Sequence, residues 1–236
     1  MINYLLNFPS YILRKFRSKK FSYSQTGMDL LLSHIFKNQK RGFFIDVGCN
    51  HPVYNNNTYL LYKKGWRGMN IDLDEKSIDL FNLFRKHDYN QNIAVSSKFD
   101  DAELYYYHDK SPINTINKIN ADFQKVRHKE IKNIKTHTLD SIIALSPFNG
   151  KKIDFLTIDV EGQELEVLKG FDLKKYSPKI VVVEYLDLSL KKLEIINFNI
   201  QNVLSSPLYT YMINNNYVLV NWIHSDLVFV NNDNVS

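Results

Sequence analysis

Two short apolar runs that each end on an aspartate constrain the fold of this chain most strongly. The first is GFFIDVG, residues 42–48, in which Asp46 stands just before the closing Val47 and Gly48, and the second lies in GMNIDLD, residues 68–74, with Asp72 at the strand end. Continuous apolar runs of this length are typical of strands that are buried on both faces of a parallel sheet. The carboxyl ends of parallel strands lie at one edge of the sheet, where ligands bind. We therefore expect Asp46 and Asp72 to belong to one ligand site.

Strand and helix patterns alternate along the rest of the chain. Helices are expected at 57–65, 75–87, 163–171 and 206–216, and further strands at 92–97, 152–162 and 178–187. Additional strand or loop structure is expected at 102–108 and 134–143, and an antiparallel pair of strands at 217–223 and 225–232. This alternation predicts an α/β fold with a mostly parallel sheet, an antiparallel C-terminal hairpin and helices on both faces.

Positive charge is concentrated at the N-terminal end. The net charge is +5 at pH 7, yet residues 1–23 contain five basic residues and no acidic one. We therefore interpret residues 1–23 as a basic amphipathic arm and residues 24–236 as one domain. The arm could contact a membrane peripherally through apolar and basic side chains, or pack on its own domain or a partner. Its apolar stretch is too short to span a bilayer, so we expect a cytoplasmic protein, at most held at the inner face of a membrane.

The loop after the first run indicates which ligand the site takes. Gly48 allows the backbone to turn tightly and approach a ligand, and Asp72 can accept hydrogen bonds from ribose hydroxyls. The loop lacks the G-x-G-x-x-G pattern and the Gly-Lys-Ser/Thr pattern that hold phosphates. A cofactor with a ribose and no phosphate fits best, and S-adenosylmethionine is such a cofactor.

Several ordered segments resemble the FkbM family of S-adenosylmethionine-dependent methyltransferases. They are SQTGMD at 24–29, the stretch 43–72, THTLDSII at 136–143 and IDFLTIDVEGQELEVLKG at 153–170. The resemblance implies a Rossmann-like class I methyltransferase fold with a seven-stranded sheet. It also implies methyl transfer to a hydroxyl of a sugar, polysaccharide or secondary metabolite, so the expected partner is a small-molecule or glycan acceptor.

By position, the resemblance also implies roles for individual residues in cofactor binding. Asp46, Gly48 and Asn50 would line the methionine end of the cofactor, Asp72 would hold its ribose, and Asn92 and Ala94 would lie near its adenine.

Four residues are candidates for the chemistry, which needs an acceptor hydroxyl that is oriented and deprotonated. Asp159 and Glu184 end two neighbouring expected strands, and Glu161 follows Asp159 in the loop. A general base or acceptor-orienting role is our preferred interpretation of these acids, and a divalent metal site is less favoured. His51, just after the glycine turn, is the other candidate base. Residues 111–116 are expected to meet the substrate.

Two alternatives remain open at this stage. Met28 stands where the family usually has glutamate, which leaves room for a catalytically degenerate, cofactor-binding scaffold in a glycan-assembly complex. A nucleic-acid methyltransferase is the other alternative. Because the positive charge is confined to the arm, we expect no nucleic-acid partner. The single cysteine, Cys49, excludes a disulfide within the chain, and the oligomeric state is not indicated.

Overall fold

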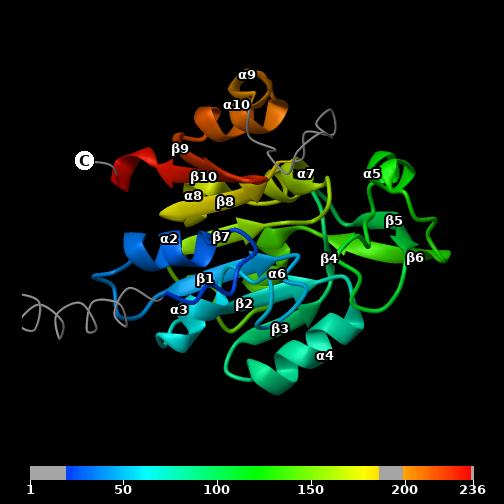
Figure 1. The fold of residues 1–236 in the computed structure, drawn as a ribbon, viewed down its shortest axis with the longest axis horizontal. Helices are drawn as coiled ribbons and strands as arrows, with labels where there is room; N and C mark the ends of the chain where they lie inside the picture. The colour runs from blue at the N-terminus through cyan, green and yellow to red at the C-terminus, as the bar shows by residue number, and fades with distance from the viewer. Residues whose placement is uncertain (1–19, 186–198, 235–236) are drawn as a thin grey trace, which may run out of the picture.

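The computed structural model describes residues 20–185 and 199–234. A seven-stranded sheet with the order β3-β2-β1-β7-β8-β10-β9 forms its centre (Figure 1). Its strands are β1 (Phe43–Val47), β2 (Arg67–Asp72), β3 (Tyr89–Asn92), β7 (Phe155–Ile158), β8 (Ile180–Glu184), β9 (Tyr217–Ile223) and β10 (Asp226–Asn231). The first five pair in parallel, whereas β10 is antiparallel to both β8 and β9. The predicted fold class, including the C-terminal hairpin, is confirmed.

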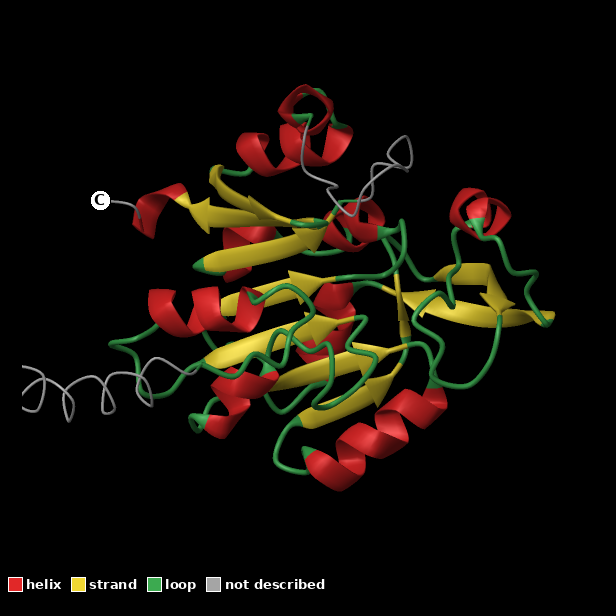
Figure 2. Ribbon diagram, viewed as in Figure 1, coloured by secondary structure: helices red, strands yellow, loops and turns green. Residues whose placement is uncertain are grey.

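Helices cover both faces of this sheet (Figure 2). An apolar cluster on one face joins the sheet to α2 (Met28–Ile35) and α3 (Tyr59–Lys63). A larger cluster on the other face joins it to α6 (Leu139–Leu145), α7 (Glu164–Lys169), α8 (Leu173–Tyr176), α9 (Ile200–Leu204) and α10 (Pro207–Asn214). Helix α4 (Glu75–Phe84) lies against β2 and β3, and a short 3-10 turn, η1 (Asn232–Asn234), follows β10.

Alternation along β1 decides which face each of its side chains joins. Phe43, Ile45 and Val47 belong to the larger cluster, and Phe44 belongs to the cluster under α2 and α3. Successive side chains of a strand point to opposite faces. Asp46 therefore lies on the α3 side of the sheet, together with Phe44.

A second, three-stranded sheet lies beyond the carboxyl ends of the parallel strands, in the order β4-β6-β5 (Figure 1). It consists of β4 (Ala94–Val95), β5 (Asp100–Tyr106) and β6 (Glu130–His137), and α5 (Lys118–Phe123) precedes β6. The single strand expected at 92–97 was wrong. The chain leaves the main sheet after Asn92, and Ala94 then pairs with Thr136 of β6.

The expectation of strand or loop throughout 134–143 was also partly wrong. Strand β6 ends at His137, and α6 begins directly after Thr138. The Thr138 hydroxyl accepts a hydrogen bond from the Ser141 amide at 3.2 Å. Thr138 is therefore an N-cap, and the apolar run that follows it folds as a helix and not as a strand.

The predicted arm, residues 1–23, lies mostly outside the described residues, so its membrane contact stays a prediction. Among the helices that the structure describes, none is both long and apolar enough to cross a bilayer.

Candidate active site

A cavity of about 400 Å³ opens at the carboxyl ends of β1, β2, β7 and β8. Eight of the residues singled out from the sequence line it: Gly48, Asn50, His51, Asp72, Ala94, Asp159, Glu161 and Glu184. Asp46 and Asn92 are not part of its lining. The cavity lies where an open parallel sheet is expected to bind its ligand. Gln25, from the segment before α2, also lines it, and sequence reasoning assigned no role to this residue.

Gly48 brings two strand ends into contact at the floor of the cavity. Its φ angle is +80°, and a Cβ atom at this position would lie 1.6 Å from the carbonyl oxygen of Asp159. The Gly48 amide donates to the carbonyl of Ile71 at 2.8 Å. A side chain is therefore excluded here, because the loop after β1 runs directly against the end of β7.

Asp72 is held rigidly at the end of β2. One carboxylate oxygen accepts from the Asn50 amide and the other from the Asp74 amide, both at 2.8 Å. Burial raises the pKa of Asp72 to about 7, against the opposing effect of these two hydrogen bonds. Each carboxylate oxygen can accept a further hydrogen bond. The side chain can therefore accept hydrogen bonds from a ligand in the cavity.

Asp46 has a different environment from Asp72, although both acids end strands. Its carboxylate accepts from Asn56 Nδ2 at 3.1 Å and from Thr58 Oγ1 at 2.8 Å. The fully buried Arg85 donates to Thr58 Oγ1 at 2.8 Å and forms an ion pair with Asp88 at 2.9 Å. Burial raises the pKa of Asp46 to about 6, and the Arg85 charge opposes this rise. Asp46 therefore positions the loop that forms one cavity wall.

Arg85 supports the wall of the site from within the fold, and sequence reasoning assigned it no role. It follows the last residue of α4, where an arginine usually reaches solvent and complements the helix dipole. The only sequence signal was its place beside the apolar face of that helix, which also carries Ile78 and Phe81. In the structure its guanidinium lies over the rings of Phe44 and Phe81.

The expected adenine region is divided by the structure. Asn92 donates from its side chain to the carbonyl of Asp72 at 3.1 Å and thus supports β2. Ile93, Ala94 and Val95 line the cavity instead. These apolar side chains form a wall suited to a flat, weakly polar ring.

Residues 108–116 form the opposite wall, and Asp74 fixes them. The Asp74 carboxylate accepts from the Lys110 amide at 2.8 Å and from Asn114 Nδ2 at 3.2 Å, and it also caps α4 through the Ser77 amide. Ser111 and Asn114 line the cavity, as do Pro112 and Ile116. The segment expected to meet substrate therefore faces the site.

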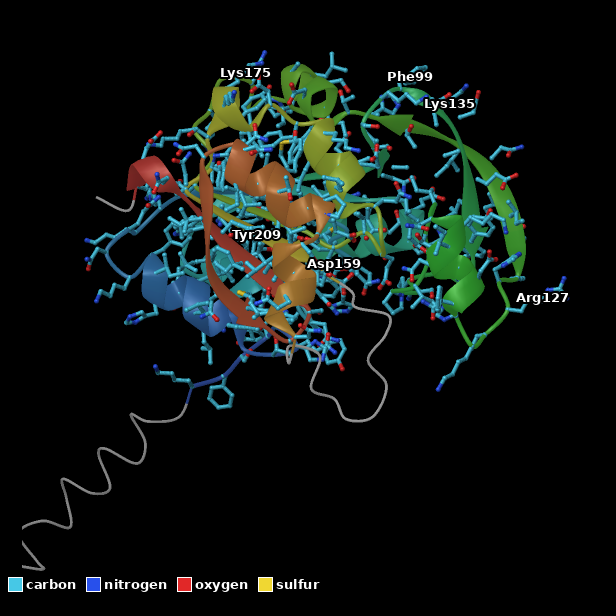
Figure 3. The ribbon with its side chains drawn as sticks, turned by 90° about the horizontal axis from the view of Figure 1, so that it is seen from above. Phe99, Arg127, Lys135, Asp159, Lys175 and Tyr209 are labelled. Atoms are coloured by element: carbon cyan, nitrogen blue, oxygen red, sulfur yellow. The ribbon has the colours of Figure 1, made fainter. Side chains whose placement is uncertain are left out.

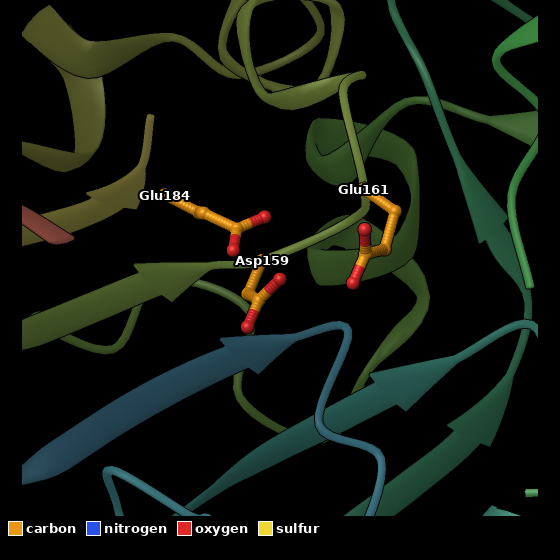
Figure 4. Close-up of side chains that lie close together, drawn as sticks. All are labelled: Asp159, Glu161 and Glu184. Carbon is orange, nitrogen blue, oxygen red and sulfur yellow. The ribbon is translucent and has the colours of Figure 1, made fainter. Parts of the chain in front are cut away.

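Three carboxylates meet at the inner end of the cavity, and we call them the acid cluster: Asp159, Glu161 and Glu184. Their side chains point toward one another (Figure 4), and one oxygen from each lies within 4.8 Å of the others. Asp159 comes directly after β7, and Glu184 is the last residue of the neighbouring strand β8. Seen from above, Asp159 lies between the main sheet and the three-stranded sheet, with Lys135 near the outer edge (Figure 3).

Burial and mutual repulsion oppose the ionisation of the acid cluster. Asp159 opens into the cavity, but protein encloses it on its other sides, and this enclosure raises its pKa. Burial, reinforced by the Asp159 charge, also raises the pKa of Glu161 to about 8 and that of Glu184 well above its usual value. Asp226, opposite Glu184 in the sheet, has its pKa raised to about 7 by burial and by Asp159.

The loop after β7 is tightly constrained. Glu161 adopts a φ angle of +58°, which is uncommon for a residue other than glycine. Its carbonyl accepts from Thr115 Oγ1 at 3.0 Å and from Asn120 Nδ2 at 2.6 Å. Glu164 accepts from the amides of Val160 and Gly162, so it organises this loop and is not a free acid. The strained conformation of Glu161 is therefore held from both sides.

His51 is arranged as a hydrogen-bond donor. Its Nδ1 atom accepts from the amides of Val53 and Tyr54 at 3.2 and 2.9 Å. Burial and the nearby Lys110 charge lower its pKa. A neutral ring with Nδ1 as acceptor carries its proton on Nε2. This arrangement does not suit the general-base role considered for His51, and it offers an N–H to a ligand instead.

Met28 does not reach the cavity. It is fully buried in the apolar cluster under α2, together with Leu32 and Trp66. Cys49 is also buried, and it packs against Ile78 and Phe81. Both residues stabilise the fold through packing.

Comparison with known proteins places the chain in a family. The model of the Methyltransferase FkbM domain matches residues 46–214. No curated protein sequence matches the chain significantly. The solved structure of a TehB-like SAM-dependent methyltransferase from Corynebacterium glutamicum ATCC 13032 Kitasato is similar over 98% of this chain and 100% of its own, with 9% identity and a TM-score of 0.42. The match to the FkbM model spans more than half of the chain, and the protein therefore belongs to the FkbM-domain methyltransferases.

Proposed function

We propose that the protein transfers a methyl group from S-adenosylmethionine to a hydroxyl of a sugar, polysaccharide or secondary metabolite. The observation that carries this proposal is the composition of the cavity. Asp72 stands at one end, where it can hold a ribose, and the acid cluster stands at the other, where it can orient a hydroxyl. Membership of the FkbM methyltransferases supports methyl transfer as the reaction.

The residues present fit this cofactor. Gly48 lets the loop after β1 run directly against the end of β7 beside the cavity, Asp72 offers carboxylate lone pairs, and Ile93 to Val95 form an apolar wall. A cavity of about 400 Å³ is within the usual range for ligands of this size. The bound cofactor would supply a methyl group on a positively charged sulfonium, and the negative charge of the acid cluster would favour that cation.

A second, smaller hollow indicates where the acceptor would enter. It has a volume of about 250 Å³ and shares Glu184 with the cofactor cavity. Asn117, Asn120 and Tyr185 give it hydrogen-bonding groups, while Leu165 and Leu208 give it apolar surface. Such a mixture suits a sugar, which presents hydroxyls at its edges and C–H groups on its faces. Glu184 would then lie between the acceptor and the cofactor, where it can orient the hydroxyl.

The first test is calorimetric titration of the protein with S-adenosylhomocysteine, with NAD⁺ as a control. We expect micromolar binding of S-adenosylhomocysteine and no binding of NAD⁺. Transfer of a radiolabelled methyl group to a panel of glycans and polyols would then identify the acceptor. Failure to bind S-adenosylhomocysteine would contradict the proposal at its first step. Binding of this ligand without transfer to any acceptor would favour the degenerate scaffold.

We also propose that residues 1–23 bring the enzyme to anionic membranes, which supports a position at a cytoplasmic membrane face. The basic residues of this arm are the basis of the proposal. Pelleting with vesicles that contain anionic lipid should retain the full chain and release a chain lacking residues 1–23. Equal pelleting of both would refute it.

A further inference from the structure

We infer that Asp159, Glu161 and Glu184 together bind one divalent cation. One oxygen from each lies within 4.8 Å of the others, and the three side chains lie close together (Figure 4). Ca²⁺ takes oxygen ligands at about 2.3–2.6 Å, so two oxygens on opposite sides of the ion are about 5 Å apart. Three oxygens at separations of 4.8 Å lie about 2.8 Å from the point equidistant from them, so small side-chain rotations bring all three to Ca²⁺ distance. Mg²⁺ would need a larger contraction than Ca²⁺, because its oxygen ligands lie at about 2.0–2.1 Å.

The state of Glu184 is independent evidence for a ligand. The residue is only 9% exposed, and no N–H or O–H group of the described residues donates to its buried Oε2 atom. The hydrogen bond between the carboxyl groups of Glu184 and Asp159 needs a proton on one of them, so the two acids repel each other once both are ionised. A buried carboxylate oxygen without a partner loses its hydration and gains nothing in return. Asp226 lies directly opposite Glu184 in the sheet and adds negative charge instead of relieving it. A cation bound between the three carboxyl groups would give this oxygen a positively charged partner.

In the described part of the chain, no lysine or arginine side chain forms an ion pair with the acid cluster. The ion pairs found there join lysine and arginine side chains to other acids, such as Asp154 with Lys179 and Asp88 with Arg85. Glu164 shows what an ordinary acid in the same loop does, because its carboxylate accepts two backbone amides. The acid cluster differs from these examples in having carboxylates that face one another.

The donor set defines the kind of cation. Three carboxylates without histidine or thiolate ligands are hard oxygen donors, which favour Mg²⁺, Mn²⁺ or Ca²⁺ over Zn²⁺ or copper. The site lies beside the second hollow, because Glu184 lines both spaces. Its role rests on the proposed function: the ion would bind the acceptor hydroxyl and lower its pKa, so that its proton passes to water in the open cavity. The oxygen would then form its bond to the methyl carbon as the bond from that carbon to the sulfonium breaks, and S-adenosylhomocysteine would leave. Acceptors with two adjacent oxygen atoms, such as vicinal diols, would bind best.

The test measures the metal alone, without cofactor or acceptor. The full chain is titrated with Mn²⁺, with free ion followed by electron paramagnetic resonance, and then with Mg²⁺ and Ca²⁺ by calorimetry. We expect one Mn²⁺ site, weakened at least about tenfold in Glu184→Gln and in Asp159→Asn. Glu130→Gln is the matched control, because Glu130 is an exposed acid paired with Lys132, and it should bind Mn²⁺ like the wild type.

Melting temperatures measured with and without Mn²⁺ check that the variants fold. Glu184→Gln replaces a buried acid whose ionised form is disfavoured by burial and by the neighbouring carboxylates, so its melting temperature should equal or exceed that of the metal-free wild type. Mn²⁺ should raise the melting temperature of the wild type and of Glu130→Gln, and leave that of Glu184→Gln unchanged. No binding of any of the three ions at millimolar concentration would overturn the inference. Equal Mn²⁺ binding in an Asp159→Asn/Glu184→Gln double variant would also overturn it.

Failure of the metal site can be separated from failure of the proposed function. If S-adenosylhomocysteine binds and methyl transfer continues unchanged in a chelator, the metal inference fails and the function stands. If Mn²⁺ binds as expected and S-adenosylhomocysteine does not, the metal site stands and the proposed function fails.

Discussion

Replacement of Asp72 by asparagine should stabilise the protein at alkaline pH and weaken cofactor binding. Asp72 is 9% exposed, and burial raises its pKa from 3.8 to about 7. The folded state therefore holds the proton more tightly than the unfolded state does. Below about pH 4 both states are protonated and this residue causes no loss of stability. As the pH rises toward 7 the loss grows, and above about pH 7 it is fully present, at about 4 kcal/mol.

Asparagine does not ionise, so the variant escapes this loss. It keeps one acceptor oxygen and gives up the hydrogen bond to the amide of either Asn50 or Asp74, which costs about 1 kcal/mol. Asp72→Asn should therefore be about 3 kcal/mol more stable than the wild type near pH 8, by the difference of these two estimates. Near pH 4 it should be less stable by about 1 kcal/mol.

Urea unfolding of both proteins at several pH values measures this crossover. Asp79→Asn is the control, because the Asp79 side chain is 57% exposed, and it should follow the wild type at every pH. Calorimetry should show that Asp72→Asn binds S-adenosylhomocysteine at least about tenfold more weakly, since one acceptor for the ribose hydroxyls is lost. Parallel stability curves for wild type and variant would refute the electrostatic reasoning. Unchanged affinity would refute the ribose assignment.

Three further predictions concern the residues that shape the cavity. Gly48→Ala should abolish S-adenosylhomocysteine binding, because its Cβ would lie 1.6 Å from a backbone oxygen. Gly65→Ala is the control: Gly65 has a similar positive φ but open space around it, so this variant should lose only about 1–2 kcal/mol of stability and keep its affinity. Arg85→Met should lose about 3–5 kcal/mol in urea unfolding, since it leaves Asp88 buried and unpaired; a loss below about 1 kcal/mol would show that the ion pair is dispensable. Asp74→Ala should speed proteolytic cleavage at residues 108–116 and destabilise the protein by about 1–2 kcal/mol, because it removes both the α4 cap and the anchor of that segment; an unchanged cleavage rate would contradict the anchoring role.

The sheet and the place of the site were predictable because both depend on short-range patterns. Strands such as β1 and β8 are buried along their whole length, and such strands appear in the sequence as continuous apolar runs. Parallel strands bring their carboxyl ends to one edge, so Asp72, Asp159 and Glu184 had to converge once the strands were found.

The remaining details depend on tertiary structure. Asp46 and Asp72 look alike in sequence, but Asp46 faces the loop that Arg85 holds and Asp72 faces the cavity. From the sequence, Arg85 is expected at a solvent-exposed helix end, because no local pattern identifies Asp88 and Thr58 as its partners. The division of residues 92–97 between two sheets follows from pairing with β6, which is distant in sequence. Local patterns do not contain such information.

Glu184 lines both the larger cavity and the smaller hollow, and this bears on how the acceptor specificity of the protein can change in evolution. Several residues of the smaller hollow, Asn117, Ile119, Asn120 and Leu208, belong to α5, its N-cap and α10. Substitutions there would alter the shape presented to an incoming molecule and leave the strand-end carboxylates in place. A descendant of this chain could therefore exchange one acceptor for another through a few changes in two short helices, with the remaining machinery inherited intact.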